Sequence, residues 1–215
     1  MLGNHPLGRV ANLWRYPLKS LAAESLERGE VLAGGFAGDR RAALFVATPE
    51  RPRSGKTYRG KEHPLLHTVG TAEAAADLAR AREIDVERRD DGPYFDLDPV
   101  SILFDTWLAD VERALGGRLD PLRFRPNIFA RATDGFDCAE AELVGHVVRV
   151  GAVRLRVTQP IQRCVTPTYD IATGASDPRI LTQLVHHRHN EMGVYAQVVV
   201  PGTIVPGDSV EIEPR

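Results

Sequence analysis

Apolar and polar residues alternate along several short stretches of this chain, which is typical of β-strands with one buried face. The clearest stretch spans residues 147–157, where every second residue from Val153 is apolar and arginines stand between them. Gly151-Ala152 lies in its middle and predicts a hairpin turn. Comparable patterns, or continuous apolar runs, predict further strands at residues 9–16, 30–32, 41–47, 84–88, 128–132, 194–200 and 209–212.

Three other segments carry apolar residues at helical spacing after a residue that can cap a helix N-terminus. The expected caps are Thr71 for a helix over residues 72–82, Asp105 for a helix that ends at Gly116, and Asp177 for a third helix. Strands outnumber helices and are separated by short glycine- and proline-containing turns. We therefore predict a mainly β protein with peripheral helices, of the α+β class, built as a barrel or a sandwich.

The composition narrows the class of protein and of partner. Of 215 residues, 43% are hydrophobic and 26% are charged, as in ordinary globular proteins. The net charge of −2 provides no general attraction to nucleic acid or to an anionic membrane, so neither is expected as a partner. The two cysteines form no disulfide framework, and neither a signal peptide nor an apolar run of ~20 residues is recognisable. We therefore expect a soluble cytoplasmic protein.

Several common enzyme classes lack their sequence signatures here. The chain contains no G-x-G-x-x-G dinucleotide motif, no Walker-type phosphate loop and no G-x-S-x-G nucleophile motif. These absences argue against a Rossmann dehydrogenase, a P-loop NTPase and a serine hydrolase.

Cys164 is the strongest single candidate for chemistry. It lies in a polar loop after a predicted strand, next to Arg163, and a nearby cation favours the reactive thiolate. The alternative is an inert, buried cysteine, which is the usual state of a free thiol. Cys138 is expected to be a bystander, although it could also pair with or resolve Cys164.

Basic and polar residues gather near the ends of predicted strands. If these ends meet, arginine forks, a lysine and a serine would suit a small phosphorylated anion, although exposed arginines are more often solvated or paired with carboxylates. The clusters are Lys19-Ser20, Arg40-Arg41, Arg123 with Arg125 and Asn127, and Arg163.

His186 and His189 stand three residues apart and would share a face if the third helix continued past them. A zinc site needs about four ligands, and no acidic or thiol partner stands at a recognisable spacing. The alternative is a polar helix end, where a cationic histidine suits the helix dipole.

Taken in order, these clusters resemble the MOSC family, named for the C-terminal domain of molybdenum cofactor sulfurase, and within it the amidoxime-reducing branch. The resemblance spans nearly the whole chain. The matching elements are Tyr16-Pro17-Leu18-Lys19-Ser20, Gly38-Asp39-Arg40, Phe124-Arg125-Pro126-Asn127, the spacing Cys164-x3-Thr168-x-Asp170-x2-Thr173-Gly174, and a closing Pro201-Gly202 followed by Gly207-Asp208.

The resemblance implies a MOSC-type β-barrel interlocked with a β-rich N-terminal portion, divided as residues 1–122, with two helices, and 123–215. It also implies that the molybdenum cofactor (molybdopterin) is bound, with catalytic roles for Cys164 and Asp170 and with Cys164 as the metal ligand. The residues that it implies for cofactor binding are Lys19, Ser20, Arg40, Arg125, Asn127, Arg163 and Thr168. Thr166-Pro167 departs from the usual run after the cysteine.

The resemblance further implies an oxidoreductase that reduces small N-hydroxylated compounds, such as hydroxylamines and amidoximes, to amines and amidines. Two cysteines are too few for an iron–sulfur cluster, so electrons are expected from a separate flavin, iron–sulfur or haem protein. Two alternatives stay open: a sulfur-transfer module with a persulfide on Cys164, and a cofactor-binding protein without turnover. The basic loop 49–61 could cover the site, dock the donor or be plainly solvated.

Overall fold

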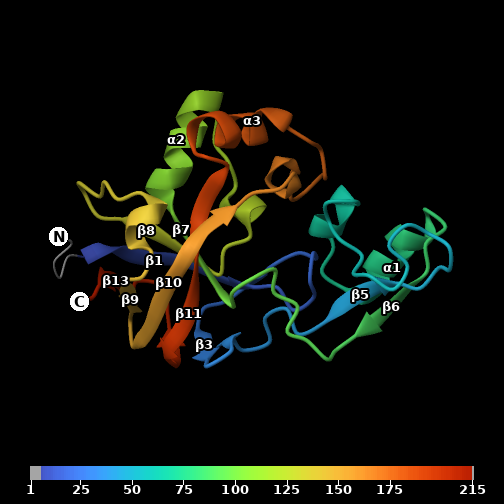
Figure 1. Ribbon diagram of the computed structural model, residues 1–215, viewed down its shortest axis with the longest axis horizontal. Helices are drawn as coiled ribbons and strands as arrows, with labels where there is room; N and C mark the ends of the chain where they lie inside the picture. The colour runs from blue at the N-terminus through green and yellow to red at the C-terminus, as the bar shows by residue number, and fades with distance from the viewer. Residues whose placement is uncertain (1–5, 215) are drawn as a thin grey trace.

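Seven strands form a closed barrel in the computed structural model, which describes residues 6–214 (Figure 1). Around the barrel each strand pairs with the next, and β13 closes it by pairing with both β9 and β1. All these pairs are antiparallel except β7 with β8, which run parallel. In barrel order the strands are β1 (Pro6–Arg15), β13 (Ser209–Ile212), β9 (Val147–Val150), β10 (Val153–Gln162), β11 (Glu191–Val200), β7 (Val100–Phe104) and β8 (Ile128–Ala132).

The alternation in the sequence matches the barrel wall. Val153, Leu155 and Val157 point into the barrel core and are buried, while the arginines between them are exposed. The hairpin between β9 and β10 turns at Gly151, as predicted. This confirms the expected β-barrel, and the N-terminal β1 is one of its wall strands, between β8 and β13.

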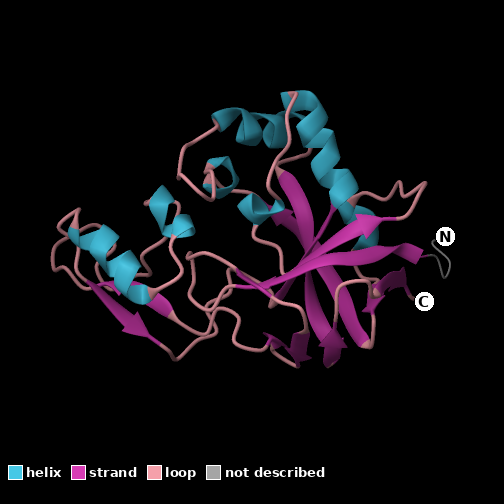
Figure 2. Ribbon diagram, turned by 180° about the vertical axis from the view of Figure 1, so that it is seen from behind, coloured by secondary structure: helices cyan, strands magenta, loops and turns pink. Residues whose placement is uncertain are grey.

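Helices cover the barrel rather than fill it. Figure 2 shows α2 (Asp105–Leu115) and α3 (Pro178–His187) together on one side of the strands. α2 buries Trp107, Leu108 and Val111 against the barrel and ends at Gly116 in the left-handed conformation. None of the helices in residues 6–214 has the length and apolar character that crossing a membrane requires.

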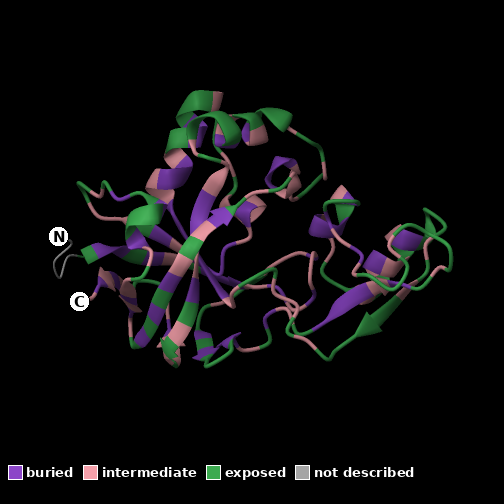
Figure 3. Ribbon diagram, in the orientation of Figure 1, coloured by how far each residue is buried: buried purple, intermediate pink, exposed green. Residues whose placement is uncertain are grey.

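A smaller body projects from one side of the barrel (Figure 1) and is called the small lobe here, residues 43–89. It contains β5 (Ala43–Val46) paired with β6 (Val86–Arg89), the helix α1 (Ala72–Arg80) and the 3-10 turn η1 (Pro64–Thr68). Thr71 caps α1, as expected, by accepting a hydrogen bond from the Ala74 amide. Side chains of the small lobe, together with Leu18, Leu21 and Ala42, form a second apolar core separate from that of the barrel; buried positions are purple in Figure 3.

The remaining elements are short. β12 (Gly202–Ile204), β3 (Gly29–Leu32) and β4 (Gly35–Phe36) form a three-stranded sheet, and β2 (Glu24–Ser25) pairs with β1. The remaining 3-10 turns are η2 (Pro121–Phe124), η3 (Glu140–Leu143) and η4 (Thr166–Thr168).

Three sequence expectations need correction. β7 was not predicted, because its continuous burial gives no alternation. Asp105 does not cap α2: Phe104 is the cap residue, and the Asp105 carboxylate accepts from the Ala132 amide at 2.8 Å instead. β12 forms where only a turn was expected.

Candidate functional site

A cavity of about 320 Å³ lies where the barrel meets the small lobe. The barrel side contributes the loop after β1, the η2 turn and the end of β10, and the small lobe contributes Arg59–Lys61 and His67. Six residues predicted for the site line this cavity together: Lys19, Ser20, Arg40, Arg125, Arg163 and Cys164.

Three of these residues are held on unusual backbone. Ser20, Arg40 and Arg125 have positive φ angles of 72°, 49° and 53°, in the left-handed region that residues with a Cβ seldom adopt. Such conformations persist only where surrounding contacts enforce them, and they gather at functional sites. Their convergence on one cavity therefore supports a functional role for it.

The contacts that enforce the Arg40 conformation centre on Asp39, which is completely buried. Its carboxylate accepts hydrogen bonds from the Tyr16 amide at 2.6 Å and from Asn127 Nδ2 at 3.2 Å, and it forms an ion pair with Arg40. The guanidinium groups of Arg40 and Arg125 lie over the Tyr16 ring, 4.7 and 4.1 Å from its centre. Burial raises the pKa of Tyr16, so its ring stays neutral between the two cations.

Arg125 and Arg163 carry charges that no carboxylate of residues 6–214 neutralises by a salt bridge. Arg125 Nη1 donates to the Leu21 carbonyl at 2.7 Å, and Arg163 Nε donates to the Met192 carbonyl at 2.9 Å. Burial lowers the pKa of both guanidinium groups to about 10, and both remain charged at neutral pH. Arg125 Nη2 is buried, and none of the described residues accepts a hydrogen bond from it. Uncompensated buried cations favour an anionic ligand.

The ammonium group of Lys19 already has hydrogen-bond partners in the protein. Its ammonium group donates to Asp96 Oδ1 at 2.6 Å and to the Tyr94 carbonyl at 3.1 Å. The Asp96 side chain is largely exposed, so this ion pair is weak in free energy. An incoming anion can therefore exchange with Asp96 for the lysine.

Cys164 is exposed and free, and its Sγ lies 3.2 Å from Thr166 Oγ1. The thiol faces the cavity from the loop that follows β10. Cys138 is also free but lies elsewhere, buried beside α2, where Trp107 Nε1 donates to its carbonyl oxygen. Burial raises the pKa of the Cys138 thiol to about 11, which agrees with an inert bystander.

Three residues predicted for the site do not line the cavity. Asn127 is 1% exposed and holds Asp39 and Ser101 together. Thr168 is also buried, and its hydroxyl donates to the Val165 carbonyl at 2.7 Å. Their proposed cofactor contacts stay predictions, and the geometry gives both a supporting position behind the cavity wall.

Asp170 likewise lies outside the cavity lining. Its carboxylate accepts from the Thr173 hydroxyl at 2.9 Å and from the Thr173 and Ala172 amides, and these hydrogen bonds, with the charge of Arg123 at 2.7 Å, lower its pKa. Arg123 also donates to the Thr168 carbonyl. The pair therefore ties the loop after Cys164 to η2, and a direct catalytic role for Asp170 stays a prediction.

Several cavity residues carry no signal in the sequence. His67 is 7% exposed, its ring stacks on Tyr169, and it comes from no motif. Burial and the Arg125 charge lower its pKa to about 3, against an opposing hydrogen bond to the Ser20 backbone, so its imidazole is neutral. Asp96 and Tyr195 also line the cavity without any local pattern that could have identified them.

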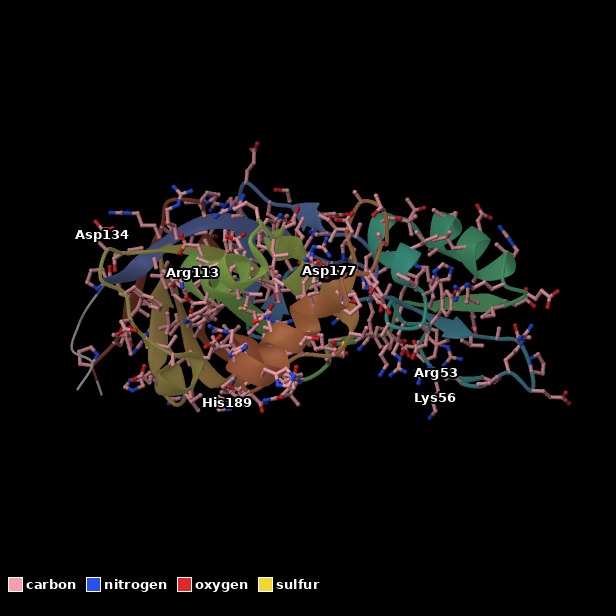
Figure 4. The ribbon with its side chains drawn as sticks, turned by 90° about the horizontal axis from the view of Figure 1, so that it is seen from above. Arg53, Lys56, Arg113, Asp134, Asp177 and His189 are labelled. Atoms are coloured by element: carbon pink, nitrogen blue, oxygen red, sulfur yellow. The ribbon has the colours of Figure 1, made fainter. Side chains whose placement is uncertain are left out.

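The loop 49–61 divides between two locations. Arg59 and Lys61 line the cavity. Arg53 and Lys56 lie at the small-lobe end of the molecule, as the labels in Figure 4 show, and do not line it. The end of the loop therefore lines the cavity, Tyr58 is buried in the second apolar core, and Lys56 is exposed.

The metal interpretation of the histidine cluster is wrong. α3 ends at His187, and His189 has a φ of 52°, so His186 and His189 do not share a helix face. Across the described part of the chain, no three His, Cys, Asp or Glu side chains are grouped to hold a metal ion.

Comparisons with known proteins agree with this architecture. The YuaD protein from Bacillus subtilis has a similar crystal structure, with a TM-score of 0.60 and 15% identity over 99% of this chain and 98% of that one. A crystal structure described as a hypothetical protein matches with a TM-score of 0.50 and 10% identity, over 98% of this chain and 70% of that one. These likenesses concern the fold alone. No curated protein matched significantly.

The sequence also matches two family models, one after the other along the chain. The MOSC N-terminal beta barrel domain matches residues 7–89, which include β1 and the small lobe. The MOSC domain matches residues 94–211, more than half of the chain, including Arg125 and Cys164. With the barrel, the cation-lined cavity and the exposed thiol described above, these matches establish that the chain belongs to the MOSC domain family.

Proposed function

We propose that this protein binds a molybdenum-containing pterin cofactor in the cavity and acts as an oxidoreductase that reduces small N-hydroxylated compounds to amines or amidines. The observation that carries the proposal is the pairing, in one cavity, of an exposed thiol with guanidinium groups that lack carboxylate partners. A separate protein would supply the electrons.

The thiol and the guanidinium groups of the cavity are chemically suited to a molybdenum-containing pterin cofactor. A thiolate is a soft ligand suited to a metal–sulfur centre, and arginine forks bind phosphate in a bidentate manner. Arg125 Nη2, buried without a partner, is the kind of donor that a ligand oxygen would satisfy.

In this proposal Cys164 ligates the metal, and Lys19, Ser20 and Arg40 bind the phosphate tail. Arg125 and Arg163 neutralise the remaining negative charge. The bound cofactor supplies the electron-transfer and oxygen-transfer chemistry. The chain orients it: Asp39 fixes Arg40, and Arg123 with Asp170 holds the cysteine loop.

Metal and pterin analysis tests the proposal directly. Protein purified from a host that makes the cofactor should contain stoichiometric molybdenum and pterin, and Cys164→Ala should lose the molybdenum. Cys138→Ala is the matched control, because that thiol lies outside the cavity. Equal molybdenum in the wild type and in Cys164→Ala would contradict the assignment of the metal ligand.

A turnover assay tests the reaction. With an artificial electron donor, the loaded protein should reduce benzamidoxime, and the Cys164→Ala variant should not. A loaded protein that shows no turnover with benzamidoxime or hydroxylaminopurine would instead be a cofactor-binding protein without catalysis.

The exposed thiol also supports a second candidate, a sulfur-transfer module. Here a cysteine desulfurase would pass the sulfur of its own persulfide to the Cys164 thiolate. Mass spectrometry after incubation with desulfurase and cysteine should then show one added sulfur on Cys164. An unmodified thiol together with retained pterin would exclude this candidate.

A further inference from the structure

Asp96 is the only acidic side chain among the described residues that line the cavity. The other charged residues of the lining are lysines and arginines, so one fixed anion stands among cations. Desolvation at the cavity wall raises the pKa of its carboxylate, but the charges of Lys19, Arg40 and Arg125 outweigh that effect and lower the pKa. Asp96 is therefore ionised at neutral pH, and its charge opposes that of any anion that enters the cavity.

The Asp96 side chain can leave its position without a movement of the backbone. It lies in the loop between β6 and β7, which is anchored on either side of it. The Tyr94 amide donates to a backbone carbonyl at 2.9 Å, and the Asp98 carboxylate accepts from the Thr158 hydroxyl at 2.6 Å. Between these anchors the Asp96 side chain is 76% exposed, and within residues 6–214 its carboxylate accepts a hydrogen bond from Lys19 alone. Rotation about its side-chain bonds is therefore enough to release it to solvent.

Lys19, by contrast, is held in the cavity wall by contacts that do not involve Asp96. Its side chain is 17% exposed, and its backbone amide donates to the Ala42 carbonyl at 2.8 Å. Its ammonium group also donates to the Tyr94 carbonyl at 3.1 Å. These contacts persist when Asp96 rotates away, so the lysine stays at the cavity and only its anionic partner changes.

Charge, rather than the number of hydrogen bonds, sets the two anionic partners of Lys19 against each other. An ammonium group has three hydrogens, and Asp96 with the Tyr94 carbonyl uses two of them. A phosphate-type oxygen on the third would lie within about 5 Å of the Asp96 carboxylate, because both would bind one nitrogen. Two negative charges at that distance repel each other, and the exposed Asp96 side chain relieves the repulsion by moving into water.

We propose that Asp96 is an internal competitor for Lys19: it occupies the lysine while the cavity is empty and is displaced when an anionic ligand binds. Only a fraction of the empty protein then has Lys19 available, and the apparent affinity for the anion falls by that fraction. Asp96 thereby regulates how tightly the cavity binds an anion. The inference rests on the proposed function only in that an anion binds in this cavity, and it needs no molybdenum.

Asp96→Asn tests the competition directly, because the amide keeps the size of the side chain and removes its charge. We expect this variant, purified without cofactor, to bind inorganic pyrophosphate about fivefold more tightly than wild type in titration calorimetry, since an exposed ion pair contributes up to about that factor. Asp90→Asn is the matched control: it removes the same charge from an exposed residue outside the cavity and should bind like wild type. Circular dichroism and thermal unfolding establish that each variant is folded.

A second background isolates the role of Lys19. Lys19→Gln removes the group for which Asp96 competes, so adding Asp96→Asn to it should change the affinity by less than about twofold. A crystal structure of the wild-type protein with pyrophosphate gives an independent readout. In it Lys19 Nζ should contact a phosphate oxygen, and the Asp96 carboxylate should have moved out of contact with Nζ.

Unchanged or weaker binding by Asp96→Asn would overturn the proposal, because Asp96 would then be irrelevant to the ligand or would only position the lysine. A gain of full size in the Lys19→Gln background would show repulsion through space instead of exchange. Pyrophosphate bound beside an intact Lys19–Asp96 ion pair, or no binding by wild type and Asp96→Asn alike, also contradicts it. None of these results depends on molybdenum content, so they are distinguishable from a failure of the proposed function.

Discussion

Some residues at the cavity have unfavourable backbone conformations or lie close to a like charge, and surrounding contacts hold them there. Arg40 and Arg125 adopt left-handed backbone and place two like charges over one aromatic ring. The buried carboxylate of Asp39 offsets one of these charges and receives the amide of Tyr16. The other charge has no carboxylate partner within residues 6–214, since the hydrogen bonds of Arg125 there go to a carbonyl and an imidazole.

The low pKa of His67 predicts an acid-sensitive contribution to stability. The folded value of about 3 lies below the ordinary value of 6.5, so the unfolded chain takes up a proton first as the pH falls. Stability is therefore lost between about pH 6.5 and pH 3. From pH 7 to pH 5 this group alone should cost about 2 kcal/mol. The charged and aromatic groups that face the ring are Arg125 and Tyr169, with Arg59 and Lys61 on either side of Gly60.

Urea unfolding at pH 7 and at pH 5 measures this contribution. The free energy of unfolding should fall by about 2 kcal/mol more in wild type than in His67→Gln. His186→Gln should behave like wild type, since that histidine is exposed. An equal fall in wild type and His67→Gln would mean that His67 is protonated in the folded protein.

At the scale of elements, barrel closure brings the first and last segments of the chain together. β1 pairs with β13 on one side and with β8 on the other. The backbones of β1 and β8 approach closely at Gly8, where a Cβ would lie 2.3 Å from the Arg131 carbonyl oxygen. That atom belongs to a paired strand and cannot move aside as a flexible side chain could.

Gly8→Ala should therefore destabilise the barrel. We expect a loss of roughly 1–3 kcal/mol in the free energy of unfolding, measured by urea titration, because the two strands must separate locally. Gly117→Ala is the matched control: a Cβ there meets no atom within 4 Å, and its φ is not positive. A loss in Gly117→Ala as large as that in Gly8→Ala would show that general glycine effects, not strand contact, are responsible.

Over the whole molecule, the cavity exists because two bodies with separate apolar cores meet. The contact includes Tyr169, whose hydroxyl donates to the Lys61 carbonyl and whose ring stacks on His67. The loop that carries the thiol therefore rests against the small lobe. A ligand bound between them would contact both bodies.

Hydrogen–deuterium exchange tests this arrangement. Residues 59–67 should exchange more slowly in cofactor-loaded protein than in cofactor-free protein, because the ligand would pack against this wall. β6 is the internal control, since it belongs to the small lobe but does not line the cavity. Protection confined to barrel segments would mean that the small lobe is not part of the ligand site.

Much of this fold is determined by local sequence. Alternation with a period of two predicted the hairpin of β9 and β10, and the capping residues Thr71 and Asp177 predicted the starts of α1 and α3. Ordered motifs indicated the family and named six of the residues that line the cavity. Local patterns predict these elements because each has one face in solvent and one in the core, so apolar residues recur at the period of the element.

Tertiary structure decided the rest. β7 carries no alternation because it is buried throughout, and its parallel pairing with β8 has no local signature. Long-range contacts placed Asn127 behind the cavity wall, Asp170 outside the cavity lining and His67 within the wall. A motif specifies which residue types are present, but the packing of segments far apart in the chain determines which side chain faces a ligand and whether its charge has a partner.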